Sequence, residues 1–152
     1  MQLTSSAFRN DEVIPQKYTC DGQNVSPPLS WTAPPIGTKS LALICEDPDA
    51  PGGTWHHWAI FDIPPDQRAL TEHVPRADGP NGPRQARNDF HKGGYDGPCP
   101  PHEHGAHRYR FRLFALSVEK LPLPGRPPCK DATLKALDYA IAEAELIGVY
   151  ER

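Results

Sequence analysis

The sequence predicts a mainly β fold: a two-sheet antiparallel sandwich with one or two short helices, one of them near the C-terminus. Short apolar runs recur along the chain, and clusters of proline and glycine separate them. Such clusters indicate turns and loops between strands. Only one stretch, close to the C-terminus, has apolar residues at helical spacing. We therefore favour a sandwich over a parallel α/β sheet, in which helices would alternate with strands.

Three segments are the strongest strand candidates. Residues 39–46 include a run that is apolar at both parities, as expected of a strand buried on both faces. Residues 56–63 form a second apolar run, which ends at two prolines. In residues 108–118, large apolar residues first alternate with arginines, and this pattern predicts one buried and one exposed face. Weaker candidates are residues 2–8, 29–32, 87–90 and, at the end of the chain, 146–150.

The predicted helix precedes the last of these strands. Asp131 can cap its N-terminus, because an aspartate side chain accepts hydrogen bonds from the free N–H groups of a first turn. Four apolar residues follow at helical spacing, and such a stripe normally faces the core. They are Leu134, Leu137, Ile141 and Ala144.

Length and charge narrow the class of protein. The 152 residues suit one domain, residues 1–152, without an internal repeat or linker. A net charge of −3 gives no general attraction for nucleic acid, so the arginines at 108, 110 and 112 are interpreted as a solvated sheet face. No apolar run approaches the roughly 20 residues that span a bilayer. We therefore expect neither a nucleic-acid partner nor a membrane span.

The cysteines and the N-terminus bear on the cellular compartment. Cys20, Cys45, Cys99 and Cys129 are widely spaced and form no C-x-x-C pair. The first ten residues contain no basic stretch followed by an apolar segment, as a secretory signal would. The sequence therefore predicts a cytoplasmic protein whose four thiols are reduced.

The first segment that carries chemistry is residues 47–58. Asp47 and Asp49 stand among prolines, which fix φ and so hold both carboxylates on a stiff backbone. Two histidines follow at the start of the next strand. By parity, His57 shares the apolar face with Ala59, Phe61 and Ile63, whereas the preceding histidine points the other way. His57 is therefore expected at the edge of the core.

The second segment is residues 94–111. His107 and Tyr109 have the parity of Phe111, so they too belong to an apolar face. Two separate strands thus each begin with a histidine on the buried side. If these strands are neighbours, two imidazoles, a phenol and two carboxylates meet at one end of the sandwich. A small polar cluster on an apolar floor is typical of a ligand pocket.

The two segments together resemble a known family. Asp-Pro-Asp-Ala-Pro, Trp-His-His-Trp and Gly-x-x-Pro-Pro-x-x-x-Gly-x-His-Arg-Tyr-x-Phe are similar, in order and separation, to the signature regions of the phosphatidylethanolamine-binding (Raf-kinase-inhibitor-like) family. Weaker similarity extends over nearly the whole chain. The short form, with its C-terminal helix and strand, is similar to the bacterial branch of that family.

The resemblance implies a set of pocket residues and a type of function. It implies a cis X-Pro bond in residues 47–51, and a binding or regulatory protein without catalytic residues, metal or other cofactor. At Pro98-Cys99 the eukaryotic pattern carries Ser-Gly, so fewer backbone N–H groups remain here to contact a phosphate. The pocket residues that the resemblance implies are Asp47, Asp49, His57, Gly97, His107 and Tyr109, with Pro101 in the wall.

Our hypothesis for the ligand follows from these side chains. His57, His107 and Tyr109 can donate hydrogen bonds to a phosphate, a carboxylate or a phosphoethanolamine-like head group. The aspartates can keep the histidines protonated or accept from a ligand ammonium, and either role makes binding sensitive to pH. The family name also suggests a kinase or protease partner, and bacterial relatives suggest a homodimer.

Three alternatives stay open. The pair His102-x-His104 resembles the ligands of a cupin, which would make the protein a metal-dependent enzyme. The glutamate that a cupin needs is missing, however, because Arg108 and Tyr109 stand near its place. Cys99 could in principle be a nucleophile beside a histidine. Finally, the aspartates at 47 and 49 could simply cap the N–H groups of a rigid turn.

Overall fold

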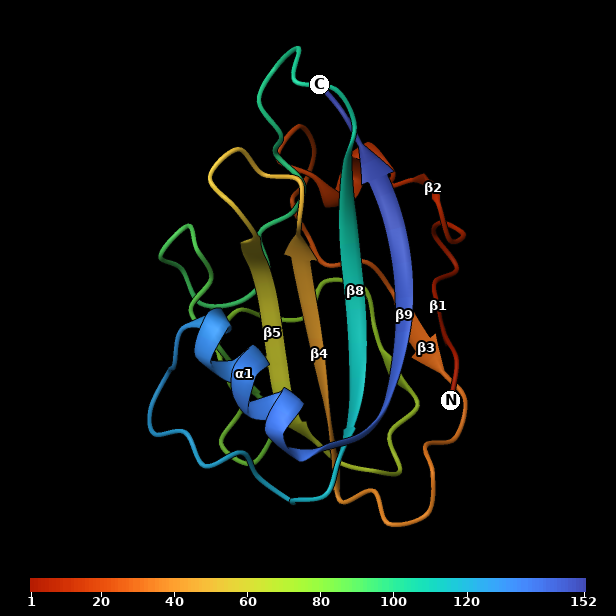
Figure 1. The fold of residues 1–152 in the computed structure, drawn as a ribbon, viewed down its shortest axis with the longest axis vertical. Helices are drawn as coiled ribbons and strands as arrows, with labels where there is room; N and C mark the ends of the chain where they lie inside the picture. The colour runs from red at the N-terminus through yellow and green to blue at the C-terminus, as the bar shows by residue number, and fades with distance from the viewer.

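The computed structural model describes all residues 1–152 and contains two β-sheets. The small sheet has the order β1-β3-β6, and the large sheet has the order β2-β9-β8-β4-β5-β7. Figure 1 shows the four long strands of the large sheet side by side, in the order β9-β8-β4-β5. The strands of the small sheet are β1 (Leu3–Thr4), β3 (Leu29–Trp31) and β6 (Ala69–Leu70). Those of the large sheet are β2 (Glu12–Val13), β4 (Ser40–Asp47), β5 (Trp55–Ile63), β7 (Arg84–Gln85), β8 (His107–Leu116) and β9 (Ala140–Tyr150). The helices are the 3-10 helix η1 (Gln16–Tyr18) and α1 (Cys129–Tyr139).

The large sheet is covered on both faces. One apolar cluster, which includes Leu43, Trp58 and Phe111, contains residues of both sheets and is the core of the sandwich. A second cluster, which includes Ile44 and Phe61, lies between the large sheet and α1, and α1 lies in front of this sheet in Figure 1. The double burial of β4 explains why its sequence is apolar at both parities. The predicted sandwich with a late helix is therefore confirmed.

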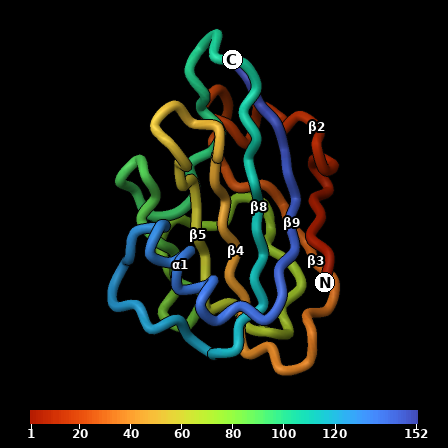
Figure 2. Tube along the Cα trace, in the orientation of Figure 1, coloured from red at the N-terminus to blue at the C-terminus, as the bar shows by residue number.

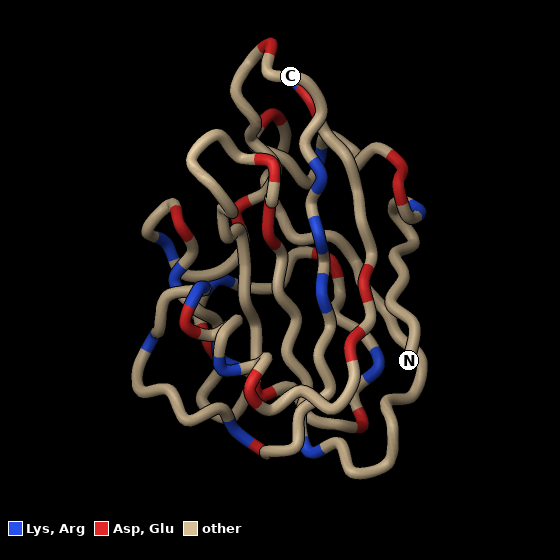
Figure 3. The backbone as a smooth tube through the Cα atoms, viewed as in Figure 1, with Lys and Arg blue, Asp and Glu red and all other residues tan.

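The first half of β8 has one buried and one more exposed face, as the alternation in its sequence predicts. Tyr109 and Phe111 are fully buried, whereas Arg108 is exposed. Arg110 donates to Glu145 at 2.6 Å and Arg112 to Glu143 at 2.8 Å, both on the neighbouring strand β9. Figure 3 shows this row of basic positions along β8, with acidic positions beside it on β9. Cross-strand ion pairs thus neutralise the basic stripe.

The C-terminal region differs from its prediction. Leu134, Leu137 and Ile141 were expected to face the core, but these residues are 54%, 45% and 46% exposed. The helix instead buries small residues, including Ala132 and Ala136, which allow it to lie close to the sheet. It ends at Tyr139, and β9 then pairs with β8 from Leu116↔Ala140 to His107↔Tyr150. The helical spacing of the stripe was therefore partly coincidental, because a long strand begins inside it.

Three smaller expectations also change. The N-cap of α1 is Pro128 and not Asp131. Asp131 lies in the first turn, where its negative charge interacts favourably with the positive end of the helix dipole. Residues 87–90 are not a strand, because Arg87 forms only isolated bridges and the edge strand is β7. The sheets are antiparallel except for β2, which pairs with β9 in parallel.

None of the helices has the length and apolar character that a bilayer-spanning segment needs.

Candidate functional site

A cavity of about 160 Å³ lies at one end of the large sheet. Because β4 lies between β5 and β8 and is antiparallel to both, its C-terminal end meets the first residues of those two strands. The loop after β4 and the loop before β8 accordingly lie at the same end of the molecule (Figure 2). The cavity is lined by Asp47, Ala50, Pro51, Trp55, His57, Phe90, Cys99, Pro100, Pro101, His107 and Tyr109.

The two histidine rings meet at Tyr109, as the sequence hypothesis required. His57 packs edge-on against the Tyr109 ring, with centroids 5.3 Å apart, and His107 stacks on it at 6.5 Å. Five of the seven residues that the resemblance implied line the cavity. They are Asp47, His57, Pro101, His107 and Tyr109.

A β-bulge turns His57 into the cavity. The pairing of β4 with β5 shifts between Cys45↔Trp58 and Glu46↔His56, which leaves His57 as the extra residue. The parity argument, which placed His57 with Ala59 and Phe61, is therefore wrong, because those two residues belong to the cluster under α1. A simple alternation cannot predict such an extra residue.

Asp47, His107 and His104 form a chain that reaches from the buried site to the surface. His107 is buried, and its Nδ1 donates to Asp47 Oδ2 at 2.6 Å. Its Nε2 lies 2.6 Å from Nδ1 of His104, so one proton is shared between two imidazole nitrogens. His104 is exposed and lies outside the cavity lining. A ligand that uses Nε2 of His107 must therefore displace His104.

His57 is held in one orientation by a backbone carbonyl. Its Nδ1 donates to the carbonyl oxygen of Asp96 at 2.7 Å, because that oxygen can only accept. Burial lowers the pKa of His57 below its usual value. The ring is therefore neutral at neutral pH, and its Nε2 carries a lone pair rather than a proton.

Tyr109 has a polar atom that the folded chain leaves unused. Its hydroxyl is buried and has no hydrogen-bond partner, although Asp47 and the backbone of Cys99 lie near it. Burial, together with the nearby Asp47 carboxylate, raises the pKa of Tyr109 far above its usual value. The hydroxyl consequently keeps its proton and remains available as a donor.

Asp49 has a different role from Asp47. It accepts from the Arg108 side chain at 2.8 and 3.0 Å and from the Arg108 backbone N–H at 2.9 Å. These bonds from Arg108 lower the pKa of Asp49 to about 2. Asp49 does not line the cavity and does not hold a histidine. It fastens the loop between β4 and β5 to the start of β8.

Gly97 is also outside the cavity lining, for a steric reason. A Cβ at this position would overlap the carbonyl of Tyr18, so only glycine allows the two backbones to approach. The Gly97 N–H donates to Asn24 Oδ1 at 2.7 Å and is not free for a ligand. Asn24 also donates to Asp96, whose carbonyl orients His57.

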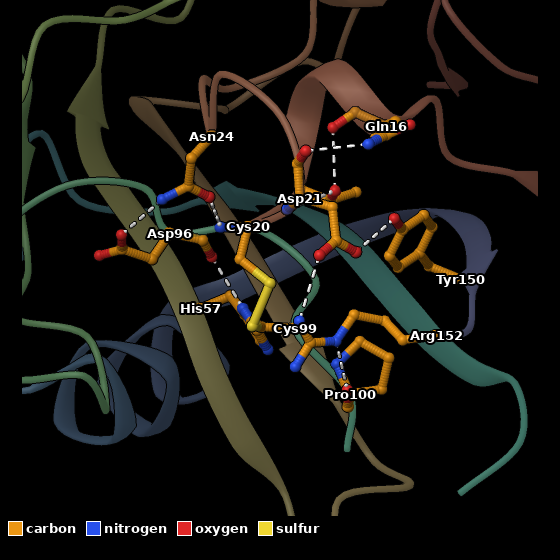
Figure 4. Close-up of a disulfide and its surroundings, with 12 residues drawn as sticks. Gln16, Cys20, Asp21, Asn24, His57, Asp96, Cys99, Pro100, Tyr150 and Arg152 are labelled. Carbon is orange, nitrogen blue, oxygen red and sulfur yellow. Dashed lines mark hydrogen bonds and ion pairs between the residues drawn. A yellow bond between two sulfur atoms is a disulfide. The ribbon is translucent and has the colours of Figure 1, made fainter. Parts of the chain in front are cut away.

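Two further expectations are wrong. The chain contains no cis peptide bond, so the predicted cis proline in residues 47–51 is absent. Cys20 and Cys99 are joined by a disulfide with a Cα–Cα distance of 5.4 Å (Figure 4), whereas Cys45 and Cys129 are buried free thiols. The partners are 79 residues apart, and no local signal in the sequence could pair them.

Two aromatic residues outside the set that the resemblance implied also line the cavity. Trp55 and Phe90 pack edge-to-face, with centroids 5.4 Å apart. Trp55 adjoins the two histidines in sequence, which is a usable signal, but Phe90 comes from a segment without one. No group of three or more His, Cys, Asp or Glu side chains converges as metal ligands would. The cupin-like alternative therefore has no ligand set in this structure.

Comparison with known proteins decides the family. The model of the family "Phosphatidylethanolamine-binding protein" matches residues 4–151. The chain belongs to the phosphatidylethanolamine-binding protein family. It is 49% identical over 152 residues to a "UPF0098 protein" of Aquifex aeolicus, and the aligned residues cover 100% of this chain and 89% of that protein. It is 51% identical over 154 residues to a "UPF0098 protein" of Methanothermobacter thermautotrophicus, at 100% and 99% coverage.

A solved structure of the same family supports the fold. The crystal structure of Escherichia coli YbcL, described as a member of the mammalian PEBP family, is 37% identical to this chain. It superposes with a TM-score of 0.93 over 99% of this chain and 98% of that chain. The family resemblance inferred from the two signature segments is thus confirmed.

Proposed function

We propose that the cavity binds a small ligand that carries a phosphate or a similar anion, such as a phosphoethanolamine-like head group. The observation that supports this most directly is the Tyr109 hydroxyl, a buried donor without a partner on a residue that lines the cavity. An unsatisfied buried hydroxyl costs about 1–3 kcal/mol. Such a cost is understandable where a ligand oxygen completes the hydrogen bond.

The size of the cavity limits what enters it. About 160 Å³ corresponds to roughly five water molecules. Pockets for drug-sized ligands measure about 300–1,000 Å³. A phosphate or head group fits inside, and the rest of a larger ligand would lie outside, beside the partly exposed Trp55.

The protons of the site favour particular ligands. Neutral His57 presents a lone pair at Nε2, so it accepts from a ligand group that brings a proton, such as monoprotonated phosphate or an ammonium. The Asp47 carboxylate disfavours a fully ionised anion and would accept from the same proton. A bound anion raises the pKa of His57, so binding takes up protons and becomes tighter as the pH falls.

Calorimetric titration with phosphate and with phosphoethanolamine, at several pH values between 5.5 and 8, tests the proposal. We expect saturable binding that strengthens toward pH 5.5. Phosphoethanolamine that binds more tightly than phosphate would assign Asp47 to the ammonium. Absence of binding heat at every pH, in protein whose fold is intact by circular dichroism, would refute the proposal.

We also propose that the exposed face of α1 joins two copies of the chain. Leu134 and Leu137 are about half exposed there, and exposed charged residues flank them at Lys130, Asp131 and Asp138. The same leucines of a second copy can cover them when two such helices pair about a two-fold axis. Light scattering of the native protein and of Leu137→Asp tests this, and a monomeric native protein would contradict it. A kinase or protease partner stays a prediction.

The cytoplasmic location also stays a prediction. The Cys20–Cys99 disulfide favours an oxidising compartment, because cytosolic thiols are mostly kept reduced. Disulfide-rich intracellular proteins of hyperthermophiles are an exception to this tendency. Fractionation of the native cells with an antibody to this chain decides between the two compartments.

A further inference from the structure

The Cys20–Cys99 disulfide belongs to the wall of the cavity. Cys99 lines the cavity beside Pro100 and Pro101, and it is half-buried. Cys20 is an exposed residue in the loop that follows η1. Figure 4 shows the sulfur bridge between the two chain segments that it joins. The bond therefore connects the protein surface to the cavity.

Few hydrogen bonds hold this wall in place. Three of the four residues 98–101 are prolines, which have no N–H to donate. The segment accepts one bond from the Cys20 N–H, at 3.1 Å to the Pro98 carbonyl. It accepts another from Arg152 Nε, at 2.9 Å to the Pro100 carbonyl, and a third, within its own loop, from the His104 N–H at 3.3 Å to the Pro101 carbonyl. The disulfide is the covalent tie between this wall and the loop that follows η1.

The residues just before the wall are anchored independently of the disulfide. The Asp96 carboxylate accepts from Arg76 at 2.8 Å and from Asn88 at 2.7 Å. The Gly97 N–H donates to Asn24, and the buried Tyr95 hydroxyl donates at 2.7 Å to the carbonyl of Tyr18, the last residue of η1. Loss of the disulfide would thus loosen residues 98–101 and leave the anchored part in place.

We propose that the Cys20–Cys99 disulfide is a thiol–disulfide exchange site whose reduction loosens the cavity wall and weakens ligand binding. This inference rests on the proposed anion-binding function of the cavity. The reductant is a dithiol, either a small molecule or a protein of the dithiol oxidoreductase class, which attacks at the exposed residue Cys20.

The exchange proceeds in two balanced steps. A thiolate of the dithiol attacks Cys20 Sγ, forms a mixed disulfide with it and breaks the Cys20–Cys99 bond. Cys99 leaves with the electron pair as a thiolate, which water protonates. The second thiolate of the dithiol then attacks the dithiol sulfur of the mixed disulfide, and Cys20 leaves as a thiolate. Two electrons pass to the protein, and the dithiol is oxidised to a cyclic disulfide.

The other two cysteines provide an internal control. Cys45 and Cys129 are fully buried. Burial raises the pKa of both thiols, which removes the reactive thiolate form. Mild treatment of the native protein with dithiothreitol is therefore expected to expose two titratable thiols per chain, at Cys20 and Cys99.

The test compares phosphate binding by oxidised and reduced protein at one pH. Ordering the backbone of even one wall residue upon binding weakens affinity about tenfold. We expect reduction to raise the dissociation constant for phosphate on the order of tenfold, and Cys20→Ser to do the same without reductant. The Cys20→Ser/Cys99→Ser double variant is the control, because dithiothreitol should no longer change its affinity. Hydrogen exchange should rise in a peptide that covers residues 98–106, and not in β8.

The outcomes separate this inference from the proposed function. If the oxidised protein does not bind phosphate, the anion-binding proposal fails. If the oxidised and reduced forms bind phosphate equally well, the function stands and the exchange inference is overturned. It is also overturned if native protein yields no thiols with dithiothreitol, or if the exchange of residues 98–106 is unchanged.

Discussion

Replacement of Tyr109 by phenylalanine should affect stability and binding in opposite directions. The substitution keeps the ring, which packs against both histidines, and removes only the buried hydroxyl that has no partner. In the ligand-free protein, this hydroxyl is a desolvated group that lacks a hydrogen bond. In the liganded protein, we propose that it donates to the ligand.

The expected magnitudes follow from these two environments. An unsatisfied buried polar group costs about 1–3 kcal/mol, so Tyr109→Phe should raise the free energy of unfolding of the ligand-free protein by about 1 kcal/mol or more. A hydrogen bond to a charged group contributes about 1.5–3 kcal/mol. The dissociation constant for phosphate should therefore rise by roughly ten- to a hundredfold.

Tyr95 offers a matched control. Its hydroxyl is also buried, but it donates to the Tyr18 carbonyl at 2.7 Å. Tyr95→Phe leaves that carbonyl without its donor, so the free energy of unfolding should fall by about 1 kcal/mol, and phosphate binding should not change. Urea denaturation without ligand and calorimetric titration with phosphate measure both quantities for the two variants.

One result would refute the reasoning about Tyr109. If Tyr109→Phe destabilises the ligand-free protein as much as Tyr95→Phe does, the Tyr109 hydroxyl already has a partner in the folded chain. The hydroxyl would then no longer support a ligand at this position. A stabilised variant that binds phosphate normally would instead place the ligand elsewhere in the cavity.

Three further predictions concern the fold around the site. Gly97→Ala should lower the free energy of unfolding by about 1–3 kcal/mol in urea denaturation, because its Cβ would overlap a backbone carbonyl, whereas Gly52→Ala, which meets no atom within 4 Å, should be neutral. The lowered pKa of His57 means that the unfolded chain binds a proton more readily than the native one. The neutral His57 ring therefore lowers the free energy of unfolding by nothing above about pH 6.5, whereas below that pH the free energy of unfolding falls as the unfolded chain takes up the proton. His57→Phe should make the free energy of unfolding less dependent on pH in denaturation curves taken from pH 8 to 5. An unchanged pH dependence would assign it to other groups. Cys20→Ser, which opens a loop of 79 residues, should lower the free energy of unfolding by about 4–5 kcal/mol, and a loss below about 1 kcal/mol would contradict the contribution assigned to this disulfide.

Much of the large sheet could be predicted from local pattern. The strands β4, β5 and β8 were located to within one or two residues of their bounds, because a buried strand needs a continuous or alternating apolar run and prolines mark its end. The two signature segments also identified the family and five of the cavity residues. These features depend on residues that are close to one another in sequence.

The errors occurred where two segments distant in sequence interact. The orientation of His57 depends on a bulge that only the pairing of β5 with β4 reveals. The exposed stripe of α1 depends on β9, which takes over the chain at Ala140 to pair with β8. The partners of Asp49 and Gly97 are Arg108 and Asn24, 59 and 73 residues away.

The sequence by itself determined where the buried strands run, which face of β8 is buried, and which short segments carry carboxylates, imidazoles and a phenol. Those properties follow from backbone periodicity and from the restricted φ of proline, which act over a few residues. The tertiary structure alone decided that Asp47, His57 and Tyr109 share one cavity and that a Cys20–Cys99 bridge closes its wall. Strand order and loop packing bring these groups together, and both depend on burial summed over the whole chain rather than on any local pattern.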